Sequence, residues 1–287
     1  AIVDTVARHR VLSTTQIAAV FFPAAGGIVS SQCRSRLRHL VAADYLTAFE
    51  RPVLRTEGRK ASLFGLTAKG LELLVTELGY TPDEIDWRPS YNTASWPFLE
   101  HQAMLGGVFI ALSQASTRAG WVIHEWVDDR VLKKTHTRTV SVLDDHGRQR
   151  NVAVVPDAYA ALGYPDALTH DLRLLHFFIE ADRATMTVAS SRAQQRTWVT
   201  RIGAYQAYFA SALPQQQYGT NRIRVLTVTT SPKRLQNLKA ATEAAGGQNR
   251  YWFTTEEQLA GETALDGEIW QKAGTREAVS LRQPDGS

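Results

Sequence analysis

Residues 30–46, SSQCRSRLRHLVAADYL, decide the fold of the N-terminal part of the chain. The serines at 30 and 31 supply hydroxyls that cap the start of a helix. Apolar side chains then recur at helical spacing, and the predicted helix runs to about Ala43. Its inner face would consist of Cys33, Leu37, Leu40 and Val41. The three arginines between them, Arg34, Arg36 and Arg38, would point mostly to solvent.

Shorter elements surround this helix in the sequence. Two further helices are predicted before it, over residues 1–10 and 16–21. Two short strands follow it, over 46–54 and 62–66, joined by a polar turn at 55–60. A last helix spans 68–78, capped by Thr67 and ended by Gly79. Three helices followed by a two-stranded hairpin is the order of a winged helix-turn-helix, which we expect to occupy residues 1–80.

The third helix is the element expected to enter the major groove of double-stranded DNA. Residues 1–70 hold ten Lys or Arg and four Asp or Glu, a net charge of 10 − 4 = +6, whereas the whole chain carries 32 − 28 = +4. A basic N-terminal end favours a polyanionic partner. The alternative is a winged helix used for protein contacts. The expected DNA contacts are Ser30, Ser31, Gln32, Arg34 and Arg38 on the helix, and Arg59 and Lys60 on the wing turn.

Length and composition indicate two domains and a cytoplasmic protein. With 287 residues and 44% apolar residues, the chain can form two cores. A single cysteine excludes an internal disulfide and fits a reducing compartment. No apolar run reaches the roughly 18 residues of a membrane span, so no membrane partner is expected. We expect a linker over 81–96, a second domain over 97–275 and a flexible tail over 276–287. Helix-turn-helix proteins often bind as dimers, so a homodimer stays open.

The second domain should contain both helices and strands. Predicted helices cover residues 98–115, 190–212 and 232–245. Predicted strands cover 121–126, 152–155, 158–162, 174–179, 223–229 and 251–253. The run 174–179 is continuously apolar, as in a central strand buried on both faces. On the helix at 190–212, the residues expected to form one apolar face are Trp198, Ile202, Tyr205 and Phe209.

Acidic residues stand at the ends of two of these strands. Pro156-Asp157 stands at the end of a strand, and Glu180-Ala181-Asp182-Arg183 ends the buried apolar strand twenty-odd residues on. This order resembles the PD-(D/E)xK nuclease-like fold, and the whole chain is then α+β. The resemblance implies that Asp157 and Glu180 bind Mg²⁺, a hard cation that prefers oxygen ligands and can activate water.

One position departs from that pattern. The nuclease lysine, two residues after the second acid, is Asp182 here. Either Asp182 is a third metal ligand or the active site has decayed. Arg183 or Arg201 could supply the missing positive charge, although arginine is a poor proton donor or acceptor. The sequence therefore leaves open whether the chain is an enzyme, a Mg²⁺-dependent DNA endonuclease or nickase.

The chain as a whole resembles the replication-relaxation family of bacterial plasmids and integrative elements. The resemblance rests on the N-terminal winged helix and on the loose but ordered segments Leu99-Glu100-His101, Pro156-Asp157-Ala158, residues 177–183, the helix with Arg201 and Tyr205, and residues 224–229. It implies sequence-specific DNA binding in replication, relaxation or mobilisation, with plasmid replication or mobilisation proteins as partners. The alternative is a non-catalytic transcriptional regulator or assembly protein with a decayed nuclease fold.

Overall fold

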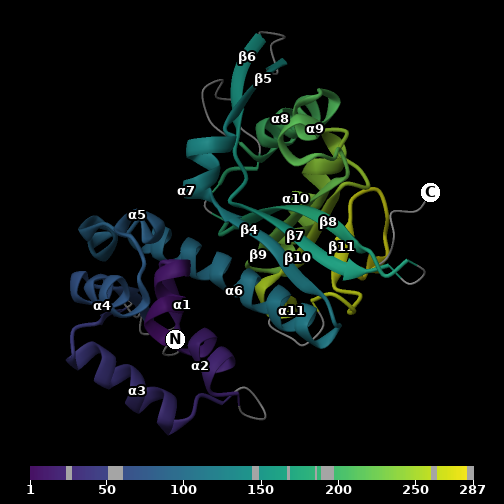
Figure 1. Cartoon of the computed structure of the whole chain (residues 1–287). Coiled ribbons are helices and arrows are strands. Elements are labelled where there is room, and N and C mark those ends of the chain that lie inside the picture. The colour runs from purple at the N-terminus through teal and green to yellow at the C-terminus, as the bar shows by residue number, and fades with distance from the viewer. Residues whose placement is uncertain are drawn as a thin grey trace. The chain divides into compact units, whose positions relative to one another are not determined.

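The structure is a computed structural model, and it confirms a mixed α+β protein (Figure 1). It describes residues 1–23, 28–50, 61–143, 149–166, 169–184, 186–188, 197–259 and 264–282. The chain divides into two compact units, Ala1–Ile110 and Ala111–Ser287. None of the described helices combines the length and the apolar character that crossing a membrane requires.

The first unit is built from helices around a small sheet. Its elements in chain order are α1 Ile2–His9, β1 Val11–Ser13, α2 Thr14–Phe21, α3 Ser31–Ala42, β2 Leu46–Phe49, β3 Leu63–Leu66 and α4 Ala68–Leu78. The strands form an antiparallel sheet in the order β1-β3-β2. The sequence predicted all four helices and the cores of β2 and β3, but not β1. The turn predicted at residues 55–60 lies outside the described residues.

Side-chain caps start the helices where the sequence placed them. The Cys33 amide donates to the Ser30 hydroxyl at 3.1 Å, and the Gly70 amide donates to the Thr67 hydroxyl at 3.0 Å. Gly79 ends α4 in the left-handed conformation, which glycine adopts without steric cost. Cys33 and Leu37 pack in a common core with Ile17. Burial raises the pKa of the Cys33 thiol, so this side chain acts as a small apolar group.

The segment expected to be a linker, residues 81–96, contains two short helices, α5 Pro82–Ile85 and η2 Pro89–Thr93. Thr81 and Glu84 form a reciprocal cap at the start of α5. Ile85 is buried, and the Trp87 indole donates to the Leu66 carbonyl at 2.9 Å. These contacts place the segment in the first unit. The long helix α6, Trp96–Arg118, then continues past Ile110 into the second unit.

A seven-stranded sheet forms the centre of the second unit (Figure 1). Its order is β12-β11-β10-β9-β8-β7-β4. The strands are β4 Val122–Asp128, β7 Ala158–Pro165, β8 Leu172–Asp182, β9 Ile223–Thr229, β10 Tyr251–Thr255, β11 Trp270–Lys272 and β12 Ala278–Val279. The pairs β8–β9 and β9–β10 are parallel, and the other pairs are antiparallel. The chain therefore forms the helix α6 and then an antiparallel meander of three strands, β4, β7 and β8. The helix α8 follows, and then β9, which is parallel to β8.

Further helices and a separate two-stranded ribbon complete the unit. The helices are α7 Asp129–Val131, the π-helical turn η3 Leu132–His136, α8 Trp198–Ala210, α9 Leu213–Tyr218, α10 Pro232–Ala244 and α11 Glu256–Leu259. The ribbon pairs β5 Arg138–Leu143 with β6 Gln149–Val154. Within the tail expected at 276–287, β12 and a buried Leu281 are ordered parts of the unit, and residues 283–287 lie outside the described residues.

Helix α8 packs its predicted apolar face on the sheet. Trp198, Ile202, Tyr205 and Phe209 are all buried. The Phe178 ring of β8 lies 5.8 Å from the rings of both Tyr205 and Phe209. Because successive side chains of a strand alternate between faces, Glu180 and Asp182 lie on the same face of β8 as Phe178. The sheet face that carries the acids is therefore the face that α8 covers.

Candidate functional site: an acidic strand end and a basic helix

Strand pairing brings Asp157 and Glu180 side by side. Ala158 pairs with Ile179 in the antiparallel β7–β8 register, so Asp157 lies opposite Glu180. The Asp157 amide donates to the Ile179 carbonyl at 3.0 Å. In return, the Ala181 amide donates to Asp157 Oδ2 at 2.9 Å. The two carboxyl groups that the sequence predicted as partners thus meet at the strand ends.

Glu180 is buried against two donors from α8. Arg201 Nη1 donates to Glu180 Oε2, and the Tyr205 hydroxyl donates to Oε1. Only 1% of the Glu180 side chain is exposed, whereas 29% of the Arg201 side chain is. Burial raises the pKa of Glu180 to about 8; Arg201 acts in the opposite direction, and the neighbouring Asp157 raises it further. Burial also raises the pKa of Tyr205, so its hydroxyl stays a donor.

Asp182 is held by a different set of donors. Arg234, in the first turn of α10, donates from Nε to Oδ2 and from Nη2 to Oδ1, each at 2.8 Å. The Thr229 hydroxyl donates to Oδ2 at 2.8 Å, and the Ala184 amide donates to Oδ2 at 3.2 Å. Arg234 also donates to the Met186 carbonyl at 2.6 Å. This is a two-pronged arginine–carboxylate pair that ties β8, β9 and α10 together.

The donor set, as arranged, fits guanidinium groups better than a metal ion. Both oxygens of Glu180 and both oxygens of Asp182 accept hydrogen bonds from arginine, tyrosine or threonine. A magnesium ion would have to displace these donors. Within the described part of the chain, no group of three or more His, Cys, Asp or Glu side chains is placed to hold a metal. The arginines supply the positive charge that an ion would otherwise supply.

The sequence predicted some members of this cluster and missed others. Of the two arginines named as substitutes for the missing lysine, Arg201 contacts Glu180, and Arg183 is partly exposed just beyond the end of β8. Arg234, Thr229 and the role of Tyr205 were missed. A signal for Thr229 was present, since it ends the next buried strand and therefore lies level with Asp182 in a parallel pair. Arg234 lies three residues into the helix that follows, and its partner cannot be read from spacing.

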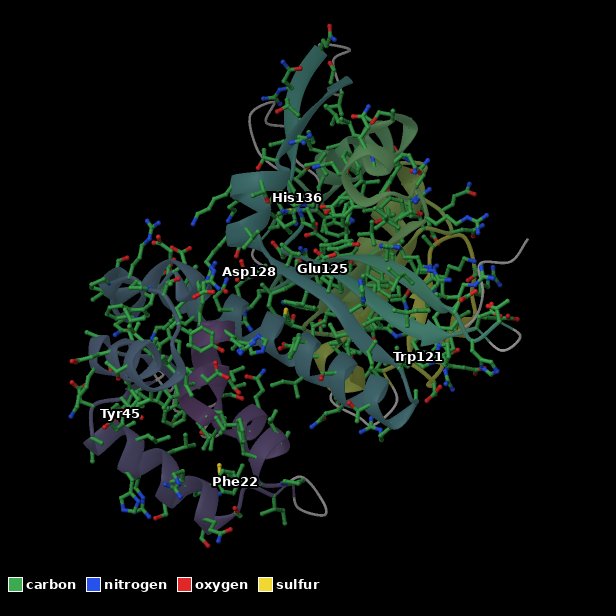
Figure 2. All side chains as sticks on the ribbon, in the orientation of Figure 1. Phe22, Tyr45, Trp121, Glu125, Asp128 and His136 are labelled. Atoms are coloured by element: carbon green, nitrogen blue, oxygen red, sulfur yellow. The ribbon has the colours of Figure 1, made fainter. Side chains whose placement is uncertain are left out.

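In the first unit, the predicted DNA contacts lie on α3, whose C-terminal end leads to Tyr45 (Figure 2). Ser31, Gln32, Arg34 and Arg38 are exposed. The Ser30 hydroxyl is used as the helix cap. Arg36 and His39 are exposed as well, so the outer side is more basic than the predicted set alone. Arg59 and Lys60 lie outside the described residues.

The charge on α3 is unbalanced. The helix contains three arginines and no acidic residue. Elsewhere in the first unit, Arg8 pairs with Asp4 at 3.1 Å and Arg88 pairs with Asp86 at 3.6 Å. Within the described residues, by contrast, no ion pair joins Arg34, Arg36 or Arg38 to an acid. An uncompensated row of arginines on one helix attracts phosphate groups.

These observations define a class of two-unit α+β protein. Its N-terminal unit carries a basic helix, and its C-terminal unit carries, on a mixed sheet, acidic residues that pair with arginines. The family model described as Replication-relaxation matches residues 4–223 of the chain, and the chain belongs to this family. The matched range includes α3, Asp157, Glu180, Asp182 and Arg201. Comparisons with curated proteins and with solved structures gave no significant match.

Proposed function

We propose that this chain is a sequence-specific double-stranded DNA-binding protein of a plasmid or mobile element, acting in its replication, relaxation or mobilisation. Membership of the replication-relaxation family supports the cellular role. The observation that carries DNA binding is the outer side of α3, with three exposed arginines and no acid. The order α1, β1, α2, α3, β2, β3 supports a winged helix-turn-helix with α3 as its recognition helix.

Replacing Arg34 and Arg38 together with alanine is expected to weaken duplex binding at least about tenfold and to reduce the salt slope by about two, because each lost phosphate contact removes about 0.9 from it. The probe is a duplex selected from a random-sequence pool by the full chain. The matched control is Arg88→Ala, which removes an exposed arginine paired with Asp86. Equal affinities of wild type and double variant at moderate salt, or failure to select any duplex, would reject the proposal.

For the second unit, we propose a PD-(D/E)xK-like fold in which the acidic residues are present but two of them pair with arginines instead of a metal ion. The order α6, β4, β7, β8, α8, β9, with only the last strand pair parallel, supports the fold. The pairing of Glu180 with Arg201 and of Asp182 with Arg234 supports a role without cleavage, as in a transcriptional regulator or assembly protein. The second candidate function is Mg²⁺-dependent nicking, which the neighbouring carboxyl groups of Asp157 and Glu180 favour.

A supercoiled plasmid that carries the selected duplex is expected to stay supercoiled when incubated with the full chain and Mg²⁺ or Mn²⁺. The reason is that the carboxylate oxygens already accept hydrogen bonds from Arg201 and Arg234. Gel electrophoresis measures the relaxed fraction. Relaxation that disappears in both Asp157→Ala and Glu180→Ala would establish the nicking function instead. Relaxation that survives both substitutions would point to a contaminating nuclease.

A further inference from the structure

The ribbon formed by β5 and β6 has two chemically distinct faces. Val140, Val142, Val152 and Val154 are buried or partly buried and belong to the core that α8 shares. By register, the opposite face consists of Thr139, Ser141, Leu143, Gln149, Asn151 and Ala153. All of these except Leu143, whose side chain lies outside the described part, are exposed. Figure 1 shows the ribbon projecting from the second unit, beyond the edge of the large sheet.

The outer face offers several hydrogen-bonding side chains. Ser141 pairs with Asn151 across the two strands, and Thr139 pairs with Ala153. Hydroxyl and carboxamide groups can both donate and accept hydrogen bonds. A protein-docking face would need large aromatic or aliphatic side chains at its centre. At the centre of this face, Ser141 pairs with Asn151, and both are polar and exposed. The chemistry of the face fits a hydrated, polar partner.

The charges around the ribbon are mostly positive. The described strands of the ribbon contain no acid and two arginines, Arg138 and Arg150, which are partly buried on the same face as the valines. The turn η3 leads into β5 and carries Lys133 and Lys134, both exposed. Asp128 and Asp129 precede them and pair with Arg130 and Lys133. Over the whole stretch of residues 128–154, the sequence has six basic and four acidic residues, a net of 6 − 4 = +2.

The dimensions also suit a nucleic acid. Six residues a strand give a ribbon about 20 Å long. The major groove of B-DNA, about 12 Å wide, admits a two-stranded β-ribbon as well as a helix. Asn and Gln side chains can pair with adenine edges, and Ser and Thr with several bases.

His136 lies at the base of the ribbon, where its ring stacks on Tyr218 with the centroids 5.4 Å apart (Figure 2).

We propose that the outer face of the β5–β6 ribbon is a second duplex-DNA contact surface, separate from α3. This inference rests on the proposed DNA-binding function and assigns it an additional surface. The ribbon inserts its hydroxyl and carboxamide side chains into a groove, and the exposed Lys133 and Lys134 at its base neutralise phosphates beside it.

The test adds two negative charges to this face. The double variant Thr139→Glu with Gln149→Glu is expected to bind the selected duplex at least about tenfold more weakly than wild type, because the new carboxylates repel the phosphates. The matched control is Asn237→Glu with Ala240→Glu, which adds the same charge at exposed positions of α10. It should bind like wild type. Circular dichroism checks that both variants are folded.

A second measurement does not depend on the stability of that variant. Ser141→Cys and, as control, Asn237→Cys each introduce one exposed thiol for a photoactivatable label, while the native Cys33 is fully buried. Crosslinking to the duplex from position 141 and not from 237 supports the inference. Equal crosslinking from both positions, or none from 141, overturns it.

The two proposals fail in different ways. If wild type and the ribbon variant bind equally while the Arg34 and Arg38 variant is impaired, only the ribbon inference is wrong. If wild type binds no duplex, both are wrong. A ribbon variant that changes the oligomeric state at unchanged DNA affinity would assign the ribbon to contacts between copies of this chain and would overturn the inference.

Discussion

Replacement of Asp182 with alanine is expected to lower the free energy of unfolding of the second unit by about 3–5 kcal/mol, the usual cost of breaking a buried ion pair. Arg234 keeps its charge, since a guanidinium is not deprotonated in proteins. Its side chain is 14% exposed and would lose both of its carboxylate bonds. Thr229 would lose its acceptor as well.

Urea denaturation followed by circular dichroism measures this loss. Asp266→Ala is the matched control, because Asp266 also pairs with one arginine, Arg282, but both side chains are largely exposed. Such surface pairs contribute about 0–1 kcal/mol. Asp182→Asn, which keeps the shape and part of the hydrogen bonding, should fall between the two. Equal midpoints for Asp182→Ala and Asp266→Ala would show that the Arg234 pair does not hold the unit together.

The substitution Glu180→Gln is expected to remove a pH dependence of stability between about pH 5 and 8. Burial raises the pKa of folded Glu180 to about 8, above its ordinary value of 4.5. The folded state therefore holds a proton that the unfolded state has released. This contribution is complete below pH 4.5 and is lost as the pH rises through 8, with a slope of at most about 1.4 kcal/mol per pH unit.

Denaturation midpoints at four pH values in this window compare the two chains. Wild type should lose stability as the pH rises, and Glu180→Gln should lose less. Glu243→Gln is the control, since hydrogen bonds from Lys239 and from the Gly274 amide lower the pKa of Glu243. Its contribution is lost only as the pH falls below about 4.5, so this variant should keep the wild-type slope. Parallel curves for wild type and Glu180→Gln would mean that Glu180 is ionised throughout.

Where capping residues and the apolar pattern indicated the same boundaries, the sequence predicted the first and last residues of the elements correctly. Thr67 and Gly79 bound α4 as expected, because a hydroxyl cap and a left-handed glycine are local features. The strand over residues 223–229 was predicted with its bounds, since all seven of its side chains are buried. The basic outer side of α3 was also predicted, because helical spacing alone separates its faces.

Elements and partners that depend on distant residues were not predicted. The alternation Thr139-Val140-Ser141-Val142 is a strand pattern, but the segment becomes a strand only by pairing with β6 across residues 144–148. Arg234 lies 52 residues beyond Asp182 in the chain. The meeting of these two side chains depends on the β8–β9 register and on the start of α10, neither of which spacing reveals. The same limit applies to Tyr205 and Glu180.

The helix α6 has a consequence for dissecting or recombining this protein. It runs from Trp96 to Arg118, and the compact units divide after Ile110, inside it. A fragment that starts at Ala111 would begin in mid-helix, with four amide groups that have lost their carbonyl partners. A truncation or gene fusion that separates the two units should therefore cut at one end of α6 and leave the helix whole. Recombination between related genes that exchanges the N-terminal unit would be limited in the same way. We therefore expect recombination points outside α6.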